Sequence, residues 1–500
     1  MKNLKFNAIN PNLNEIEKLS KEYNITPICK EIYADIITPI TLLRKISQVS
    51  QKYYLFESVV GGEKWGRYSF LGFNPIARAT CKGGCVTIED ENNENNIIYT
   101  KKPMEVIRTY LKKYKAPKIK GMPPFAGGFV GYFSYSVFGY AEPVLKFKES
   151  NFNDFDLMLF DKVIVYDHLK QKINIVVNMK TDDLTNSYNK ALNDIYDIVN
   201  LINDLSLIPN QNIQEKPQFI CNVSKEEYCN MVEKTKQYIT KGDIFQAVIS
   251  RRFETSYKSS LLNAYRVLRT TNPSPYMVFI QIDDVQLIST SPETLVKLQD
   301  GRLSSFPVAG SRPRGKNEEQ DKELEKELLE DEKELAEHNM LVDLARNDVG
   351  KISEFSSVRV LDYMMIHKYS KIMHITSEVE GNISSKHDAL DAIEAILPAG
   401  TLSGAPKIRA CEIIEELEKE PRGIYGGAIG YIDFSGNMDT CIAIRMAVKK
   451  DDKVYVQAGG GIVADSIPEN EYEESENKAK AVMESIIKAS EVKENDIANR

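Results

Sequence analysis

Apolar and polar residues repeat along the chain in two rhythms, one typical of strands and one typical of helices. β-Branched and aromatic residues cluster in short runs between Gly and Asn breakers, and this pattern predicts strands. The predicted strands are residues 54–60, 67–73, 161–169, 245–253, 276–282, 285–290, 425–434, 438–448 and 453–463. Apolar residues at helical spacing predict helices at residues 187–205, 225–240, 324–348 and 469–489. Ser224 followed by Glu227 fits a capping box at the start of the second helix.

The order of these elements favours an α+β fold. Strands and helices are interspersed without a regular βαβ rhythm, so we expect large antiparallel sheets. Residues 207–219 are polar, contain two prolines and show little periodicity, which indicates a linker. The sequence therefore divides into residues 1–206 and residues 220–500.

Composition and charge exclude several classes of protein. The chain has 500 residues, of which 42% are hydrophobic, enough for a large core, and a net charge of −8, which argues against nucleic-acid binding. Seven cysteines stand at irregular spacing without CxxC pairs, which favours free thiols in a reducing cytosol. The N-terminus lacks an apolar signal region, and no apolar run is long enough for a bilayer. We expect a cytoplasmic protein with no membrane contact.

Three distant segments carry candidate chemistry. Glu334 and Glu337 are three residues apart and share a helical face, and Glu474 lies one turn from Lys478. One carboxylate from each helix, with waters and a substrate carboxylate, would suit magnesium, which prefers oxygen and keeps few protein ligands. The glycine run 459–461 after a strand could offer backbone N–H groups to an anion. Spacing alone leaves the ordinary alternatives open, a solvated helix surface and a turn.

Five strings in order resemble the chorismate-utilising enzyme family. They are residues 307–315, 337–348, 400–410, 457–463 and 473–479. The N-terminal half resembles the large subunits of the anthranilate synthases within that family, through residues 55–58 and 66–72. The resemblance implies an α+β fold of two large antiparallel-rich sheets stacked as a sandwich and surrounded by helices. It also implies that the two halves pack as one unit, with a regulatory region at 1–206 and a catalytic region at 220–500.

The resemblance also assigns site residues. Glu337 and Glu474 match the family's magnesium ligands, and the metal would hold the ring carboxylate of chorismate. Glu334 resembles the general acid that protonates a leaving ring hydroxyl, and His374 matches a histidine that we assign to proton transfer during pyruvate elimination. Without the resemblance, a lone histidine on a strand would be interpreted as a core residue. The residues that match substrate contacts are Gln246, Gly310, Ser311, Thr401, Tyr425, Arg445, Gly459, Gly460, Gly461 and Lys478.

Two positions distinguish members of the family. Gln246 stands where the water-using isochorismate and salicylate synthases carry a lysine base, and Ala309 stands where aminodeoxychorismate synthases carry a lysine nucleophile. Ser311 replaces the usual threonine and keeps the hydroxyl. These residues favour conversion of chorismate and ammonia to anthranilate and pyruvate, the first committed step of tryptophan biosynthesis. The alternatives are aminodeoxychorismate synthase component I and a non-catalytic subunit that senses chorismate or tryptophan.

The resemblance further implies regulation and a partner. Feedback inhibition by L-tryptophan is expected, although the same strings fit a strand edge and a turn. The residues that match the inhibitor site are Glu57, Ser58, Asn272, Pro273, Pro275, Tyr276, Met277 and Cys441. No nucleophile-elbow cysteine string for glutamine hydrolysis is found, so we expect a separate glutamine amidotransferase subunit, in a heterotetramer, to supply ammonia.

Overall fold

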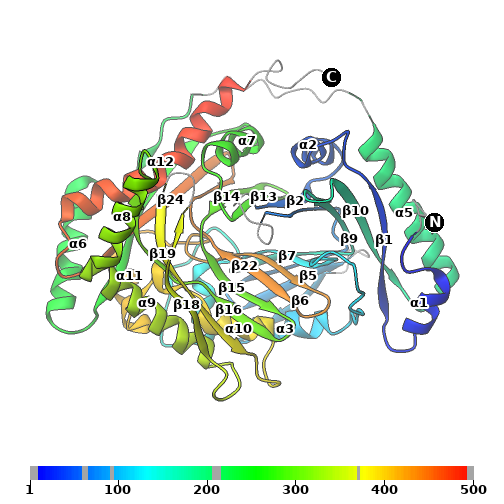
Figure 1. The fold of residues 1–500 in the computed structure, drawn as a ribbon, viewed down its shortest axis with the longest axis horizontal. Helices are drawn as coiled ribbons and strands as arrows, with labels where there is room; N and C mark the ends of the chain where they lie inside the picture. Colours follow the sequence, from blue (N-terminus) through cyan, green and yellow to red (C-terminus); the bar gives the residue numbers. More distant parts are fainter. Residues whose placement is uncertain are drawn as a thin grey trace.

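Two large antiparallel sheets form the centre of the computed structural model, and helices surround them (Figure 1). The structure describes residues 9–58, 66–90, 95–204, 206, 216–368 and 372–492. Most of the predicted linker, residues 207–215, lies outside these ranges. Within them, each sheet has 12 strands and every pairing is antiparallel.

The first sheet combines strands from both ends of the chain. Its order is β1 (Ile25–Tyr33), β10 (Lys172–Lys180), β9 (Lys162–Asp167), β3 (Tyr68–Phe73), β2 (Lys52–Glu57), β13 (Tyr276–Ile282), β14 (Val285–Ser291), β23 (Met446–Lys450), β24 (Lys453–Ile462), β12 (Gln246–Ser256) and β11 (Ile220–Cys221). The short strand β20 (Gly404–Ala405) also pairs with β12.

The second sheet is built in the same way. Its order is β17 (Val308–Pro313), β19 (Ile372–Asn382), β16 (Arg302–Ser305), β15 (Thr294–Gln299), β22 (Met438–Ile442), β21 (Ala428–Asp433), β7 (Gly128–Phe133), β8 (Phe155–Phe160), β4 (Ala77–Lys82), β5 (Cys85–Asp90) and β6 (Asn95–Tyr99). Strand β18 (Arg359–Lys368) pairs with β19 as well.

Strands from before residue 206 and after residue 220 share both sheets. β2 pairs with β13 in the first sheet, and β7 pairs with β21 in the second. The predicted α+β class with two large antiparallel sheets is confirmed. The assignment of a regulatory and a catalytic region to the two halves stays a prediction.

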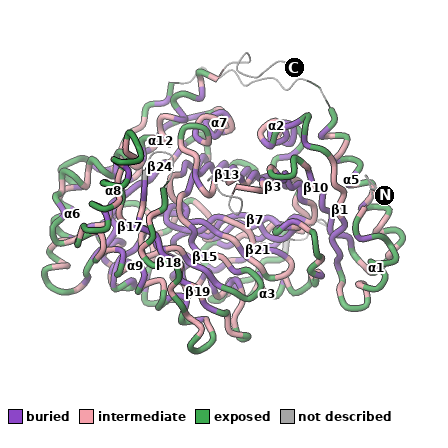
Figure 2. The backbone as a smooth tube through the Cα atoms, in the orientation of Figure 1, coloured by how far each residue is buried: buried purple, intermediate pink, exposed green. Residues whose placement is uncertain are grey.

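Alternate residues of the strands face different cores, as the two-residue period of a strand requires. On β13, Val278 and Ile280 join the cluster between the sheets, whereas Met277 and Phe279 pack in a cluster that includes α7 and α12. Figure 2 shows buried positions running through the strands and exposed positions on the outer helices. The two sheets therefore share one inner core, and helices cover their outer faces.

The helices are α1 (Leu13–Leu19), α2 (Pro39–Val49), α3 (Pro103–Leu111), α4 (Phe138–Ala141), α5 (Leu184–Asn203), α6 (Lys225–Thr240), α7 (Leu262–Thr271), α8 (Glu318–Glu330), α9 (Glu332–Gly350), α10 (Ala389–Ile396), α11 (Lys407–Leu417) and α12 (Pro468–Lys488). The capping box of α6 is confirmed, because the Ser224 hydroxyl accepts from the Glu227 N–H at 3.2 Å and the Glu227 carboxylate accepts from the Ser224 N–H at 2.9 Å. All seven cysteines are free, as their spacing predicted. Among the described residues, no helix has both the length and the apolar character needed to cross a bilayer.

The single helix predicted at 324–348 is wrong, because the chain breaks at Asp331 into α8 and α9. Asp331 has an extended ψ of 99°, and its carboxylate accepts from the N–H groups of Lys333 and Glu334. Aspartate favours this N-cap position because it satisfies backbone donors that have no partner within the helix. The break gives Glu334 and Glu337 a place in the first turns of a new helix rather than in the middle of a long one.

The single strand predicted at 438–448 is also two strands, β22 and β23, in different sheets. Both are buried, so their apolar pattern does not reveal the crossover between them. The chain crosses at residues 443–445, where Arg445 adopts a left-handed φ of 48°. This crossover places Arg445 at the junction of the two sheets.

Candidate active site

The carboxylates of α9 meet the beginning of β12. The Nε2 amide of Gln246, which is 3% exposed, donates to Oε1 of Glu337 at 3.0 Å. Burial raises the pKa of Glu334, and the nearby charge of Glu337 raises it further. The helix-face spacing thus brings both glutamates to one region, and Glu334 is the one whose protonated form is favoured.

The glycine run forms the end of β24 itself, not a turn after the strand. Gly459, Gly460 and Gly461 pair with β12, opposite residues 248–250. A Cβ added at Gly460 would lie 2.7 Å from Oε2 of Glu471, and one added at Gly461 would lie 2.3 Å from Nε2 of Gln246. Those two side-chain ends could shift, but a Cβ added at Gly459 would lie 2.3 Å from the backbone carbonyl of Ile249, so the close approach of β12 favours glycine most strongly at that position.

Helix α12 brings the second predicted metal ligand to the same glycine segment. Lys478 contacts Glu474 at 2.6 Å and donates to the carbonyl of Gly459 at 3.2 Å. Arg445 donates to the Lys478 carbonyl at 2.9 Å. Glu337 contacts Gln246, whose amide lies against Gly461. Glu474 contacts Lys478, which donates to the carbonyl of Gly459. The two carboxylates are therefore linked to the same backbone segment.

This donor set fits a magnesium ion only if the substrate completes it. No group of three or more His, Cys, Asp or Glu side chains in the described ranges is arranged to hold a metal by itself. Magnesium commonly takes one or two protein carboxylates and completes its shell with water and substrate oxygens. Burial and the charge of Glu474 raise the pKa of Glu471, so a cation would also relieve carboxylate repulsion here. Glu337 and Glu474 as magnesium ligands remain a prediction.

Tyr425 and Arg445 also lie at the Gly459 end of the glycine segment. Tyr425 is buried and accepts a hydrogen bond from the Gly459 backbone, and burial raises its pKa to about 12. Burial lowers the pKa of Arg445, while Tyr425 and Glu474 act in the opposite direction. A guanidinium held in this way can bind a substrate carboxylate in a bidentate pair.

His374 and Gly310 face each other across the β17–β19 ladder. Nδ1 of His374 donates to the Gly310 carbonyl at 3.1 Å, which assigns the proton to that nitrogen. Burial lowers the pKa of His374, and the charge of Arg445 adds to the decrease, so the ring is neutral near pH 7. Gly310 lies at a β-bulge with a φ of 62°, and a Cβ there would lie 3.1 Å from Oε2 of Glu334. Ser311 is exposed and opposite His374 in the register.

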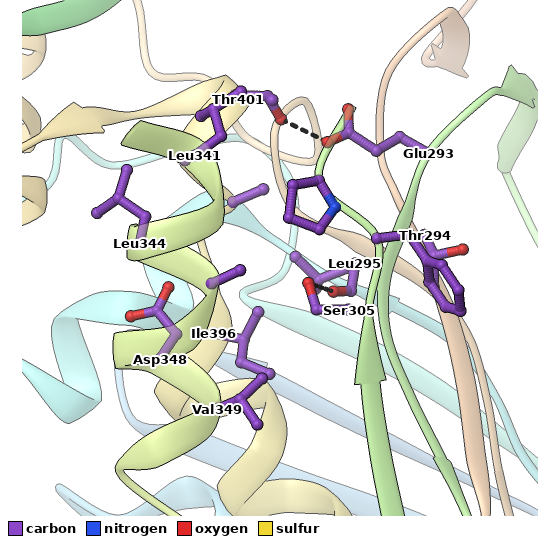
Figure 3. Close-up of a pocket in the computed structure, with 15 residues that line it drawn as sticks. Glu293, Thr294, Leu295, Ser305, Leu341, Leu344, Asp348, Val349, Ile396 and Thr401 are labelled. Atoms are coloured by element: carbon purple, nitrogen blue, oxygen red, sulfur yellow. Dashed lines mark hydrogen bonds between the residues drawn. The ribbon is translucent and has the colours of Figure 1, made fainter. Parts of the chain in front are cut away.

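Sequence reasoning missed Glu293, which lies just before β15. Thr401, in the short 3₁₀ helix Gly400–Leu402, donates to Oε1 of Glu293 at 3.0 Å (Figure 3). Burial raises the pKa of Glu293 to about 8, so this carboxyl holds a proton at neutral pH. The only sequence signal was an acidic residue between two apolar strands.

The cavity beside Glu293 lies between α9 and β15 and has a mixed lining that includes Asp348 (Figure 3). Leu341, Leu344 and Val349 of α9 line it together with Ile396. The 3₁₀ helix that carries Thr401 is held against β12, because the Val248 N–H donates to the Ser403 carbonyl at 2.8 Å. Thr401, and with it Glu293, is therefore held beside the strand that carries Gln246.

Comparison with known proteins agrees with this arrangement. Residues 53–484 match the chorismate binding enzyme family. The chain is 44% identical over 493 residues to anthranilate synthase component 1 of Acetivibrio thermocellus, a match that covers 97% of this chain and 99% of that protein. It is 45% identical, with the same coverage, to anthranilate synthase component 1 of Aquifex aeolicus strain VF5. The chain belongs to the chorismate binding enzyme family, among its anthranilate synthase component 1 members.

Solved structures of chorismate binding enzymes share the fold. The crystal structure of anthranilate synthase component I from Streptococcus pneumoniae TIGR4 has a TM-score of 0.74 and 36% identity, and covers 90% of this chain and 99% of that chain. The menaquinone-specific isochorismate synthase of Escherichia coli has a TM-score of 0.71 at 17% identity, with coverage of 95% and 98%, and shows the fold alone.

In this chorismate binding enzyme, a second cavity lies over β2, β13 and β21. Five of the predicted inhibitor-site residues line it: Glu57, Ser58, Pro275, Tyr276 and Met277. The other three, Asn272, Pro273 and Cys441, are not among its lining residues. Cys441 is buried in the core between the sheets, and Asn272 ends α7, where its amide donates to Thr290 at 2.9 Å.

Polar groups in this second cavity differ in whether they already have hydrogen-bond partners among the described residues. Glu57 accepts two bonds from Arg269 and one from Tyr265, each at 2.8 Å. The Ser58 hydroxyl, in contrast, is buried and finds no hydrogen-bond partner in the described part of the chain. Asp439, which sequence reasoning missed, also lines the cavity and accepts from the Tyr276 hydroxyl at 2.7 Å.

Proposed function

We propose that the protein is the chorismate-using subunit of anthranilate synthase, and that it converts chorismate and ammonia to anthranilate and pyruvate with magnesium. The observation that carries this proposal is the buried amide of Gln246 against Glu337, within a family whose members bind chorismate. A glutamine side chain cannot remove a proton from water. It can, however, orient a nucleophile that needs no base.

Gln246 suits ammonia in a second way. Its Oε1 atom is buried and has no hydrogen-bond donor among the residues described. A buried acceptor without a partner is costly, and an N–H of ammonia would satisfy it. Ala309 supports the same choice of reaction, because its buried methyl group cannot form a covalent amine with the ring.

Proton transfers in the proposed reaction fall to three side chains. As ammonia adds to the ring, its nitrogen gives up one proton, and the ring hydroxyl takes up one proton and leaves as water. Glu293 is the better supported donor because it lies partly buried against Thr401 with a pKa of about 8, although Glu334 also has a raised pKa. Neutral His374 is assigned to proton transfer in the second step, when the ring loses a proton and the enolpyruvyl group leaves as pyruvate.

The substrate carboxylates are proposed to bind along the glycine segment. Arg445 and Tyr425 would contact the enolpyruvyl side, and Lys478 would lie beside the ring carboxylate. When bound between Glu337 and Glu474, magnesium supplies positive charge for that ring carboxylate and makes the neighbouring ring carbon more electrophilic. The backbone at Gly310, Ser311 and the glycine run would line the ring.

An assay of the purified chain tests the proposed reaction. With chorismate, magnesium and an ammonium salt, we expect anthranilate, detected by its fluorescence, and an equal amount of pyruvate. Formation of aminodeoxychorismate instead would favour the alternative synthase. No turnover, with chorismate still bound, would favour the sensing subunit.

The proposal includes a partner subunit that supplies ammonia from glutamine. The relatives are named component 1, which implies at least one further component. A cytoplasmic heterotetramer with a glutamine amidotransferase subunit is the assembly we propose. Glutamine in place of the ammonium salt should give no anthranilate with this chain alone, and appreciable glutamine-dependent product would contradict the need for a partner.

Feedback inhibition is proposed at the second cavity, where the unsatisfied hydroxyl of Ser58 supports a polar ligand. Ser58→Ala should raise the tryptophan concentration for half-inhibition about fivefold, because one hydrogen bond contributes roughly 1 kcal/mol. Anthranilate formation at increasing tryptophan measures this. Activity of the variant without tryptophan is the control and should not change. An unaltered inhibition curve would place tryptophan elsewhere, and wild-type activity unaffected by saturating tryptophan would end the feedback proposal.

A further inference from the structure

Arg251 is a charged side chain buried inside the protein with 1% of its surface exposed. It lies on β12, five residues after Gln246, and pairs in register with Ala458, just before the glycine run. Its guanidinium stacks over the ring of Tyr472, with 3.7 Å from Cζ to the ring centre, and also faces Phe253 at 4.9 Å. A cation over aromatic faces is stabilised by the ring quadrupole, most strongly where water is excluded.

The guanidinium of Arg251 is bound to one turn of α12. Nε donates to the Ser475 hydroxyl at 2.9 Å, and Nη2 donates to the Tyr472 carbonyl at 2.8 Å. Nη2 also contacts Glu476 at 3.3 Å. These partners alternate along the helix with Glu471, Glu474 and Lys478, the residues that lie near the glycine segment. The inner face of the turn is therefore held by Arg251, while its other face carries the candidate ligands.

This turn of α12 also has packing contacts besides Arg251, since the ring of Tyr472 lies edge-on to that of Tyr228 with ring centres 5.9 Å apart. The N-cap residue Ile467 has no side-chain hydrogen bond to the first turn. Ser475 is completely buried, and its hydroxyl also donates to the Tyr472 carbonyl at 2.7 Å. Burying an arginine is costly unless its N–H donors find acceptors in good geometry. Apolar residues of similar volume often stabilise a core just as much as a buried charged group does. The guanidinium of arginine is planar and holds its N–H donors at fixed positions, so it also fixes the orientation of the helix, which apolar packing would not do.

We propose that Arg251 is a positioning residue for the metal and for the ring carboxylate of the substrate. By fixing Tyr472 and Ser475, it sets the rotation of α12 at which Lys478 contacts both Gly459 and Glu474. This inference rests on the proposed function. Residues that support a metal ligand typically change metal affinity or activity by about 10- to 100-fold when replaced.

The test uses Mn²⁺ as a probe of the metal site, because its binding is measured directly by electron paramagnetic resonance. Chorismate is present and ammonia is left out, so no turnover is needed. We expect Arg251→Lys and Arg251→Met to bind Mn²⁺ about 10- to 100-fold more weakly than the wild type. Ser475→Ala removes the acceptor of the Arg251 Nε bond together with the hydroxyl's own bond to the Tyr472 carbonyl, and it should weaken binding in the same direction, by a smaller factor. Folding of each variant is checked by circular dichroism and thermal melting.

Arg252 provides the matched control. It is the next residue on β12, points to the opposite side of the sheet and contacts Glu420 at 3.1 Å, away from α12. Arg252→Lys and Arg252→Met should bind Mn²⁺ as the wild type does.

The outcomes separate the two proposals. If folded Arg251→Lys and Ser475→Ala both bind Mn²⁺ within twofold of the Arg252→Lys control, Arg251 has only a structural role. If the Arg251 variants fail to fold, Mn²⁺ binding by Ser475→Ala alone decides between a positioning and a structural role. If the wild type itself binds no Mn²⁺ and makes no anthranilate, the proposed function fails instead.

Discussion

Replacing Glu337 with Gln should reduce magnesium-dependent turnover by on the order of a thousandfold, because a lost metal interaction removes several kcal/mol of transition-state stabilisation. The fold should persist, since Gln keeps an oxygen that can accept from Gln246, as Oε1 of Glu337 does at 3.0 Å. The measurement is anthranilate formation over a magnesium titration, with circular dichroism of the same samples. The variant should also show little dependence on magnesium at any concentration.

Glu332→Gln is the control for that experiment. Glu332 is exposed in the first turn of the same helix, so its loss changes the charge of α9 without touching the site. Its turnover should stay within twofold of the wild type. If Glu337→Gln keeps more than a tenth of the wild-type activity and its magnesium dependence, Glu337 is not a metal ligand and the role of α9 must be assigned again.

The sequence predicts the type of most elements here but not how they assemble. The apolar run at 438–448 looks the same whether it forms one strand or two, because β22 and β23 are both buried. The pairing of β22 with β15 and of β23 with β14, on either side of the left-handed Arg445, shows that the chain passes between sheets. Local pattern carries no information on sheet membership, which depends on partners such as β14 and β15 from elsewhere in the chain.

The residues of the candidate site, too, could be predicted only in part from the sequence. The glutamates at 334 and 337 could be placed on one helix face from their spacing, the glycine run was a candidate from its pattern, and the resemblance named Gln246 and His374. Glu293 and Arg251 were missed because their properties come from tertiary burial. A glutamate gives no sign in sequence of a pKa near 8, since Thr401 and the α9 leucines that enclose it are about 50 to 110 residues away. Burial of a charged group is therefore the signal that structure adds.

Glu293→Gln should reduce kcat by about 10²- to 10⁴-fold, the usual contribution of a positioned general acid. Gln fills the same volume and can still accept from Thr401, so the loss should come from the missing proton. In the wild type, kcat should fall as pH rises through about 8, because the Glu293 carboxyl then loses the proton that it donates. The residual activity of the variant should not show this decrease. Glu334→Gln is the competing case, and whichever variant removes the decrease identifies the acid.

Thermal stability gives an independent measure of the same carboxyl. The folded pKa of Glu293, about 8, lies above its ordinary value of 4.5. Its contribution to stability is therefore complete below about pH 4.5 and is lost as pH rises through about 8, since the unfolded chain releases the proton first. Glu293→Gln cannot ionise, so its melting temperature should fall less than that of the wild type between pH 5 and pH 8.5. Equal decreases in both proteins, together with an unchanged pH profile of kcat, would show that Glu293 does not titrate in this range and that the proton comes from another group.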